Sequence, residues 1–119
     1  MREEPLVLII ASEWRTRALL GAQLREEGFD ALGAQDEEEA LARLSFRKLK
    51  PHIIFIDTLN LDLKAALERL SSLCKDVPLL ICRGGLERDL DCPWNGRVVI
   101  LQKPVTIGEI VNEIKNLIE

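Results

Sequence analysis

The feature that most constrains the fold of this chain is a set of five apolar runs of strand length, which alternate with helical patterns. The runs are PLVLIIA (5–11), FDALGA (29–34), HIIFID (52–57), VPLLIC (77–82) and VVILQ (98–102). Runs that are apolar on both faces are typical of parallel strands covered by helices on both sides. Because parallel strands need right-handed crossover connections, the alternation predicts a doubly wound α/β sheet.

The segments between these runs differ in the strength of their helical pattern. Residues 63–74 and 107–118 carry apolar side chains at i, i+3, i+4 and i+7, which predicts amphipathic helices that pack on the sheet. The connection 84–96 opens with two glycines and contains Pro93. Since proline and glycine interrupt helices, we expect a short or irregular helix there.

Length and composition indicate one domain that spans residues 1–119. The apolar fraction of 47% is sufficient for one hydrophobic core, and the net charge of −4 argues against a nucleic-acid surface, which needs a basic face. No apolar run reaches the roughly 18 residues of a membrane span, and the N-terminal pattern is too short for a secretory signal. The expected location is therefore the cytoplasm, with no membrane contact.

Two groups of residues that resemble metal or redox sites have simpler structural interpretations. The three cysteines, Cys74, Cys82 and Cys92, are odd in number and do not have zinc-site spacing, so we interpret them as reduced thiols. The acidic run DEEE (36–39) stands where a helix should begin, where its charge complements the helix dipole. Neither group predicts a cofactor.

The single histidine and the two tryptophans are also interpreted as structural. His52 begins the third apolar run, at the end of the strand opposite its acidic residue. Trp14 and Trp94 are expected to pack against the protein rather than to form a ligand cage. Trp94 in an irregular loop is the better candidate for a contact surface.

Polar and charged residues gather at the carboxyl ends of the predicted strands. They are Ser12, Glu13, Asp57, Arg83 and Lys103. In doubly wound sheets, functional groups collect at this edge, where the strand order reverses. The structural alternatives are a turn residue for Asp57 and a solvated loop lysine for Lys103.

The segments IIFIDT (53–58) and LQKPVT (101–106), set in five β-α units, make the chain resemble a response-regulator receiver domain of two-component signalling. The resemblance covers essentially all of the chain. It implies a flavodoxin-like three-layer sandwich with strand order 2-1-3-4-5, the first and last helices on one face and the other three on the opposite face. It also implies that Asp57 accepts a phosphoryl group, that Lys103 contacts the phosphoryl oxygens, and that the Lys103–Pro104 bond is cis.

The sequence departs from this family where the phosphoryl group would lie. Receiver domains carry two adjacent acidic residues after the first strand, and this chain has Ala11 and Ser12 there, with Glu13 one place later. Arg83 stands at the hydroxyl-bearing switch position. Ile100 stands at the aromatic switch position. The resemblance therefore implies an atypical receiver, or pseudo-receiver, with a degraded cation pocket.

These departures weaken the expected magnesium site. Mg²⁺ prefers about six oxygen ligands, of which one or two are carboxylates. The remaining candidates are Asp57, the carbonyl of Leu59 and, more weakly, Glu13, so Mg²⁺ binding is expected to be weak. Arg83 is a candidate to form a charge-assisted hydrogen bond with Asp57 in place of the cation, and a side chain directed to water is the alternative.

Two functions remain open at this point. In the first, Asp57 receives a phosphoryl group from a histidine kinase or phosphotransfer protein and the changed surface is read by a downstream protein or output domain. In the second, a phosphorylation-independent pseudo-receiver uses its outer helices as a docking or homodimer surface. Neither makes the chain an enzyme beyond its own phosphoryl transfer. A flavodoxin-like cofactor protein ranks third, because ASEWRT (11–16) lacks the glycines of a phosphate cradle.

Overall fold

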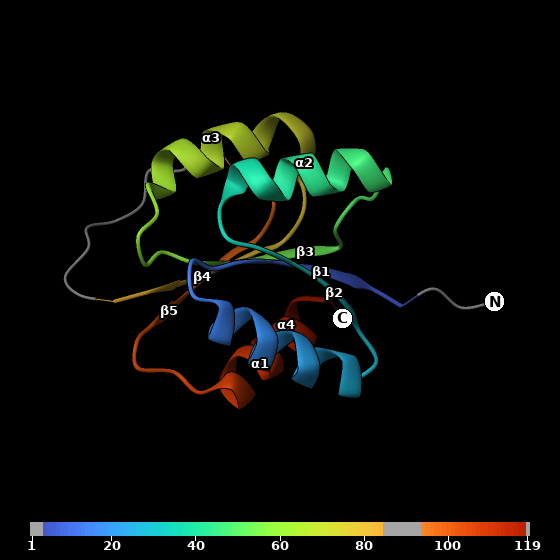
Figure 1. Ribbon diagram of the computed structural model, residues 1–119. Helices are drawn as coiled ribbons and strands as arrows, with labels where there is room; N and C mark the ends of the chain where they lie inside the picture. Colours follow the sequence, from blue (N-terminus) through green and yellow to red (C-terminus); the bar gives the residue numbers. More distant parts are fainter. Residues whose placement is uncertain (1–3, 85–93, 119) are drawn as a thin grey trace.

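The protein forms one five-stranded parallel sheet, seen edge-on in Figure 1. The computed structural model describes residues 4–84 and 94–118. The strands are β1 (Leu6–Ile10), β2 (Asp30–Ala34), β3 (Ile53–Asp57), β4 (Leu79–Arg83) and β5 (Val98–Gln102). All four neighbouring pairs are parallel and the order is β2-β1-β3-β4-β5, which confirms the predicted α/β architecture and strand order.

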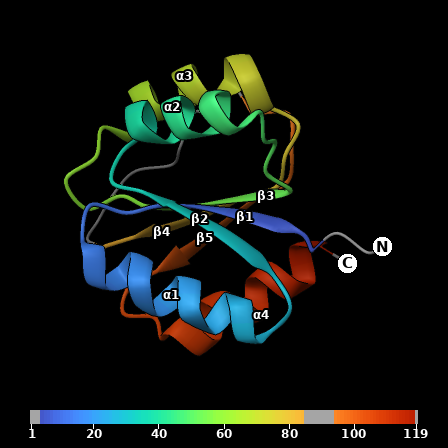
Figure 2. The ribbon, with the colours of Figure 1, turned by 45° about the vertical axis from the view of Figure 1, so that its right-hand side comes forward.

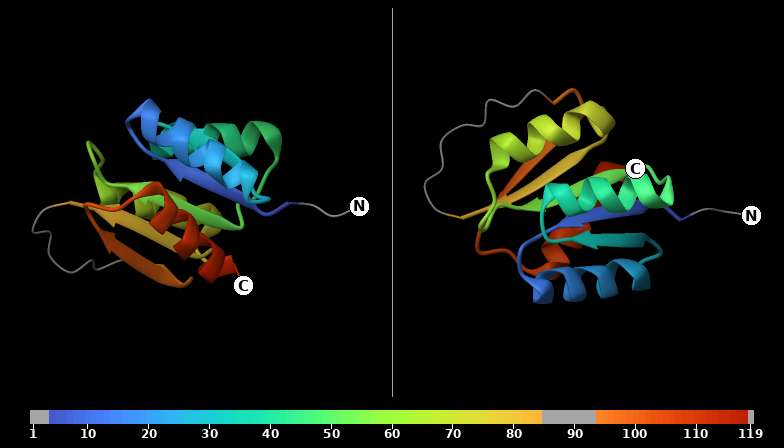
Figure 3. Two further views of the ribbon diagram at one scale, coloured as in Figure 1. Left: turned by 90° about the horizontal axis from the view of Figure 1, so that it is seen from below. Right: turned by 45° about the horizontal axis from the view of Figure 1, so that its top comes forward.

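Helices cover both faces of the sheet. They are α1 (Trp14–Glu26), α2 (Glu37–Arg47), α3 (Leu63–Cys74) and α4 (Ile107–Ile118). The first and last, α1 and α4, pack together on one face, as predicted, and α2 and α3 lie on the other (Figure 2). Figure 3 shows α2 and α3 side by side over the sheet. The predicted short helix of 84–96 falls mainly on 85–93, outside the described residues.

The core has two halves because successive side chains of a strand point to opposite faces. Leu8 and Ile54 face α2 and α3, whereas Val7 and Phe55 face α1 and α4. Both halves are fully buried at β1 and β3. These central strands therefore match the apolar pattern that predicted them.

The edge strand β5 does not match its apolar pattern. Val98 and Ile100 are 37% and 39% exposed, and the strand alternates between exposed and half-buried residues. The expectation that the run VVILQ is buried on both faces is wrong. The reason is position, since β5 pairs with a single neighbour, β4, at the end of the sheet.

Helix boundaries follow the local signals in the sequence. The Asp36 carboxylate accepts a hydrogen bond from the Glu39 N–H at 2.8 Å, and the Glu39 carboxylate accepts one from the Gln35 N–H at 3.1 Å. These reciprocal bonds form a capping arrangement at the start of α2. The acidic run is thus a helix start, as interpreted. Among the described residues, no helix combines the length and apolar character that crossing a bilayer requires.

The segment before β5 is held closely against the loop before β4. The Trp94 indole N–H donates to the carbonyl of Val77 at 2.7 Å, and the N–H groups of Asn95 and Gly96 both donate to Lys75 O. A Cβ atom at Gly96 would lie 2.4 Å from the Val77 carbonyl oxygen. Only glycine fits at this approach, and the buried Trp94 confirms its predicted packing role.

His52 is structural and Trp14 is not a packing residue. The His52 Nδ1 accepts a hydrogen bond from the Leu6 N–H at 2.9 Å, which confirms the interpretation of His52 as structural. Trp14 is 68% exposed, so its expected packing role is wrong. The buried positions of α1 begin at Leu20, and Trp14 in the first turn lies outside that apolar face.

Candidate functional site

Asp57 lies at the carboxyl end of β3, in the middle of the sheet. Asp57 is only 6% exposed, and it is the one buried charged residue in the part of the chain that the structure describes. It forms part of the wall of an open cavity of about 490 Å³, together with Glu13, Thr16, Cys82 and Lys103. The strand-end residues Glu13, Asp57 and Lys103, far apart in sequence, thus line one cavity, as the carboxyl edge of a doubly wound sheet predicts.

One oxygen of the Asp57 carboxylate receives two hydrogen bonds. The Lys103 ammonium donates to Asp57 Oδ1 at 2.8 Å, and the Leu59 N–H donates to the same oxygen at 3.0 Å. The Lys103 side chain is 33% exposed and that of Asp57 8%, so this ion pair is largely shielded from water. A charge-assisted bond of this kind is stronger than a neutral one and compensates the buried carboxylate.

The backbone places Lys103 beside Asp57 directly. The Lys103 N–H donates to the Arg83 carbonyl at 2.8 Å and so continues the β4–β5 ladder by one residue. The Lys103–Pro104 peptide bond is cis, which confirms that prediction. The role of Lys103 as a phosphoryl contact stays a prediction.

The two positions without acidic side chains take part in other contacts. Ala11 is buried, and its N–H donates to Ala34 O at 3.0 Å. The Ser12 hydroxyl donates to the Leu59 carbonyl at 3.0 Å. That carbonyl is the backbone oxygen expected to serve a cation, so Ser12 already provides it with a hydrogen-bond donor.

Arg17 belongs to the same region and was not foreseen from the sequence. Its Nη1 donates to the carbonyls of Ala11 at 2.6 Å and Ser12 at 3.2 Å. A guanidinium therefore binds the backbone of the loop in which receiver domains carry their acidic pair. The available signal was a basic residue in the first turn of α1, seven residues after the end of β1. Gly33 has no side chain, which leaves room for the aliphatic part of Arg17; a Cβ atom at Gly33 would lie 3.4 Å from Arg17 Cδ.

The donor set does not fit a firmly held Mg²⁺ ion. Asp57 and Glu13 are the carboxylates that line the cavity, and the described residues contain no cluster of three or more histidine, cysteine or acidic side chains suited to a metal. Glu13 is exposed at the start of α1, and the Leu59 carbonyl bonds to Ser12. Mg²⁺ keeps several waters and takes one or two carboxylates from a protein. Because Asp57 is already paired with Lys103 and Glu13 is exposed, weak binding remains the expectation.

The two switch positions lie at the ends and edge of the sheet. Arg83 is the last residue of β4 and is half-buried. Among the described residues, Asp57 forms an ion pair with Lys103. Ile100 lies on β5 and is 39% exposed. The hydrogen bond of Arg83 to Asp57 in place of a divalent cation stays a prediction.

Cys82 lies next to Asp57 across the β3–β4 ladder. Burial, and then the negative charge of Asp57, raise the pKa of the Cys82 thiol, and Lys103 offsets part of this effect. The thiol is therefore protonated at neutral pH and is not an activated nucleophile. Cys82 and Cys74 are free thiols, as predicted, and Cys92 lies outside the described residues.

Comparison with known proteins gives structural relatives. No family model matches the chain, and no curated protein matches its sequence. A response regulator from Thermotoga maritima shares 21% identity over 98% of each chain with a TM-score of 0.78. The receiver domain of the hybrid histidine kinase CckA shares 22% identity, covers 96% of this chain and 99% of that one, and has a TM-score of 0.75.

A third structure places the same fold inside a longer protein. NtrX from Brucella abortus, solved in complex with ADP, shares 22% identity with a TM-score of 0.79, and the match covers 98% of this chain and 26% of that one. At these identities the similarity concerns the fold. The chain has the flavodoxin-like fold of response-regulator receiver domains.

Proposed function

We propose that this chain is a receiver module of two-component signalling that acts as a protein-interaction domain without phosphorylation of Asp57. Its fold is that of receiver domains, and the Asp57 carboxylate and the Leu59 carbonyl, which a cation would use, already accept hydrogen bonds from Lys103 and Ser12. On this proposal the module works in the cytoplasm, catalyses no reaction of its own, and transmits a signal by binding a partner protein or an output domain.

The observation that carries the proposal is the hydrogen bond from the Ser12 hydroxyl to the Leu59 carbonyl, next to the buried Ala11. Phosphoryl transfer to a carboxylate brings two anions together and depends on positive charge at that point. A divalent cation about 4 Å from a unit negative charge supplies roughly 8 kcal/mol of gross attraction at an effective dielectric near 20, and an ammonium supplies about half of that. Lys103 alone therefore provides the smaller share.

A second candidate function is that of a slow phosphoacceptor. It is favoured by the 2.8 Å contact between Lys103 and Asp57 at an open cavity, which is an arrangement that can hold a phosphoryl oxygen beside an ammonium group. In this case the phosphoryl donor is a histidine kinase or a phosphotransfer protein. Weak Mg²⁺ binding through Asp57, Leu59 O and Glu13 belongs to this candidate.

The experiment that separates the two restores the missing acids with Ala11→Asp and Ser12→Asp together. Mg²⁺ binding is measured by calorimetry, and phosphorylation by a small donor such as acetyl phosphate is followed by intact-protein mass spectrometry. We expect weak or no binding and labelling in the wild type, and a gain of both in the double variant, because two carboxylates are added beside Asp57. Labelling of the double variant should disappear when Asp57→Asn is added.

The matched control is Ala11→Asn with Ser12→Asn, which adds nearly the same volume without charge. It should leave the protein folded, by circular dichroism, and should not gain labelling. If the wild type is labelled as fast as the acidic double variant, the interaction-only function is wrong and the phosphoacceptor function replaces it.

A further inference from the structure

An apolar groove lies between the C-terminal ends of α2 and α3, at the end of the sheet opposite Asp57. Its volume is about 480 Å³, and Leu41, Leu44, Leu49 and Leu73 contribute its apolar surface. Leu49 and Leu73 are 36% and 47% exposed, respectively. We refer to this site, with the lining residues Lys48 and Lys50, as the α2–α3 groove.

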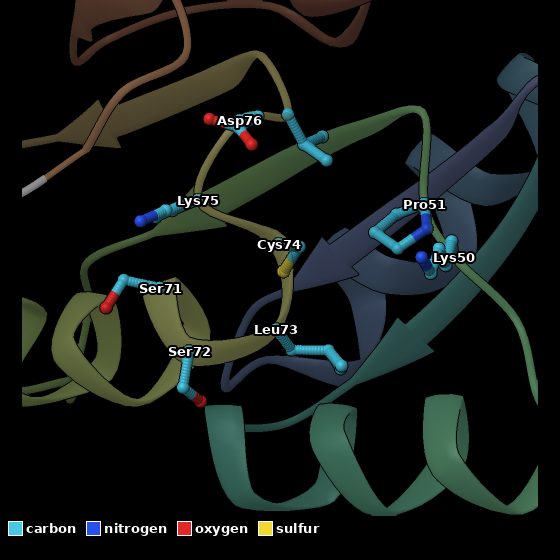
Figure 4. A pocket seen from close by; sticks show the side chains of 9 residues that line it. Lys50, Pro51, Ser71, Ser72, Leu73, Cys74, Lys75 and Asp76 are labelled. Atoms are coloured by element: carbon cyan, nitrogen blue, oxygen red, sulfur yellow. The ribbon is translucent and has the colours of Figure 1, made fainter.

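The groove continues into a smaller cavity of about 280 Å³. The two share Lys50, Ser72 and Leu73 in their walls. Figure 4 shows the smaller cavity between Lys50 and Pro51 on one side and the end of α3 on the other. Together the two cavities extend from α2 past the end of α3 to Asp76 and Val77, which leaves room for a peptide segment.

The rim of the α2–α3 groove is positively charged although the chain as a whole carries a net charge of −4. Lys48 and Lys50 line it, and Arg47 stands next to them at the end of α2. All three are exposed, and none takes part in the ion pairs found among the described residues. Asp76 is the acidic residue in the walls of the two joined cavities.

The backbone holds Lys48 at the rim in an unfavourable conformation. Its φ angle is +55°, in the left-handed region that glycine usually occupies at the end of a helix. The Lys48 N–H bonds to Ser45 O, and the Leu49 N–H bonds to Leu44 O at 3.0 Å, so that the chain turns back over the end of α2. This turn brings Leu49 to the apolar wall and leaves a lysine where a glycine would be less strained.

These observations together indicate the chemistry of a partner. We propose that the α2–α3 groove binds an acidic amphipathic segment of a partner protein. Apolar side chains of that segment fill the groove beside Leu49 and Leu73, and its carboxylates pair with Lys48 and Lys50. The proposal goes beyond the function assigned to the Asp57 end of the sheet and does not depend on whether Asp57 is phosphorylated.

Charge and shape favour a protein segment over other anionic surfaces. A membrane or a nucleic acid binds best to a broad basic face, and binding is weakened by the net negative charge of the chain. An apolar groove with a narrow cationic rim instead fits a helix that has one apolar and one acidic side. Because the chain has its own acidic turn at Glu37, Glu38 and Glu39, a second copy is an alternative occupant.

The test uses a synthetic helical peptide with leucine at i, i+3, i+4 and i+7 and glutamate on its other face. Amide shifts of the isotope-labelled protein are followed by NMR during titration. We expect shifts concentrated in residues 41–50 and 71–77, and an affinity that falls about tenfold in Lys50→Glu and in Leu73→Asp. A peptide with lysine in place of glutamate should bind at least about tenfold more weakly than the acidic peptide.

Two matched variants control for charge and for exposed apolar surface. Lys64→Glu makes the same charge reversal at the opposite end of α3, and Phe46→Ser removes an apolar side chain that is 89% exposed and does not line the groove. Both should bind the acidic peptide as the wild type does. The amide spectrum of each variant verifies that it is folded.

Several results would overturn the proposal. The proposal is wrong if the acidic peptide does not bind, or if the basic peptide binds equally well. It is also wrong if the amide shifts lie outside the groove, or if neither Lys50→Glu nor Leu73→Asp changes the affinity. Binding of anionic vesicles in place of the peptide would assign the surface to a lipid headgroup. Self-association that Lys50→Glu abolishes would assign it to a second copy of the chain.

Discussion

At the carboxyl end of the sheet, the buried Asp57 carboxylate is bonded to Lys103, whereas at the amino end Lys48 and Lys50 are exposed beside an apolar groove. The Leu59 carbonyl at the first end is likewise bonded to Ser12. Charges and polar groups that are already bonded offer less to a ligand, since an existing contact must break first. The comparison indicates that a partner is more readily bound at the amino end, where exposed lysines outside the ion pairs found among the described residues lie beside apolar surface.

The largest expected effect would disrupt the framework of the amino end. Gly96→Ala places a methyl group 2.4 Å from the Val77 carbonyl oxygen, which is backbone and cannot move aside by a rotamer change. We expect the free energy of unfolding to fall by about 3 kcal/mol, as for overpacking of a close contact. Urea denaturation followed by circular dichroism measures this, with Gly108→Ala as a control in α4, where the nearest neighbouring atom to the added Cβ is 3.8 Å away.

If Gly96→Ala costs no more than the control, the approach of residues 94–96 to the loop before β4 is looser than the structure indicates. The Trp94 to Val77 hydrogen bond would then lose its supporting role.

A matched pair of lysine substitutions compares the two ends directly. Lys103→Met removes the ammonium group that pairs with the buried Asp57 carboxylate, and should lower the free energy of unfolding by about 2 kcal/mol. The loss is not larger because Lys103 is partly exposed and water screens the pair. Lys50→Met removes an exposed cation and should change it by less than about 0.5 kcal/mol. Chemical denaturation at neutral pH gives both values, and equal losses would mean that the ends do not differ in charge compensation.

A smaller effect than that of Lys103→Met, and of opposite sign, is expected at Lys48. Lys48→Gly should raise the free energy of unfolding by about 1 kcal/mol, since glycine adopts the left-handed conformation without steric cost. Lys48→Ala removes the same charge but keeps the strain, so it should give no gain. Thermal melts of the three proteins decide the point, and a Lys48→Gly protein that is less stable than the wild type would contradict the strain at Lys48.

The regular part of the fold was predictable because its signals are local. The five apolar runs gave strands at the right places within two residues at each end, and Gly28, with φ of +92°, follows the end of α1. The fourth strand begins later than predicted, at Leu79, because Val77 is engaged by Cys74 and Trp94 rather than by the ladder. The apolar pattern of a segment does not show which distant residues bond to its backbone.

For the candidate site, the sequence indicated which residues lie near one another but not which hydrogen bonds they form. Their place at strand ends and the resemblance to receiver domains pointed to Asp57 and Lys103, and the structure places Lys103 Nζ 2.8 Å from Asp57 Oδ1. The contacts of Arg17 with the β1–α1 loop and of Ser12 with Leu59 were missed. Both depend on the direction of a side chain relative to backbone from another part of the fold, which a linear pattern does not contain.

The sequence by itself determined the order of elements, the parallel sheet and the absence of the acidic pair at Ala11 and Ser12, because periodicity and residue identity are properties of the chain. Tertiary structure alone decided that Ile100 is exposed on an edge strand and that Ser12 bonds to the Leu59 carbonyl. It also decided that Lys48 and Lys50 border an apolar groove. The physical reason is that burial and charge pairing depend on which distant segments meet, and packing brings those segments together.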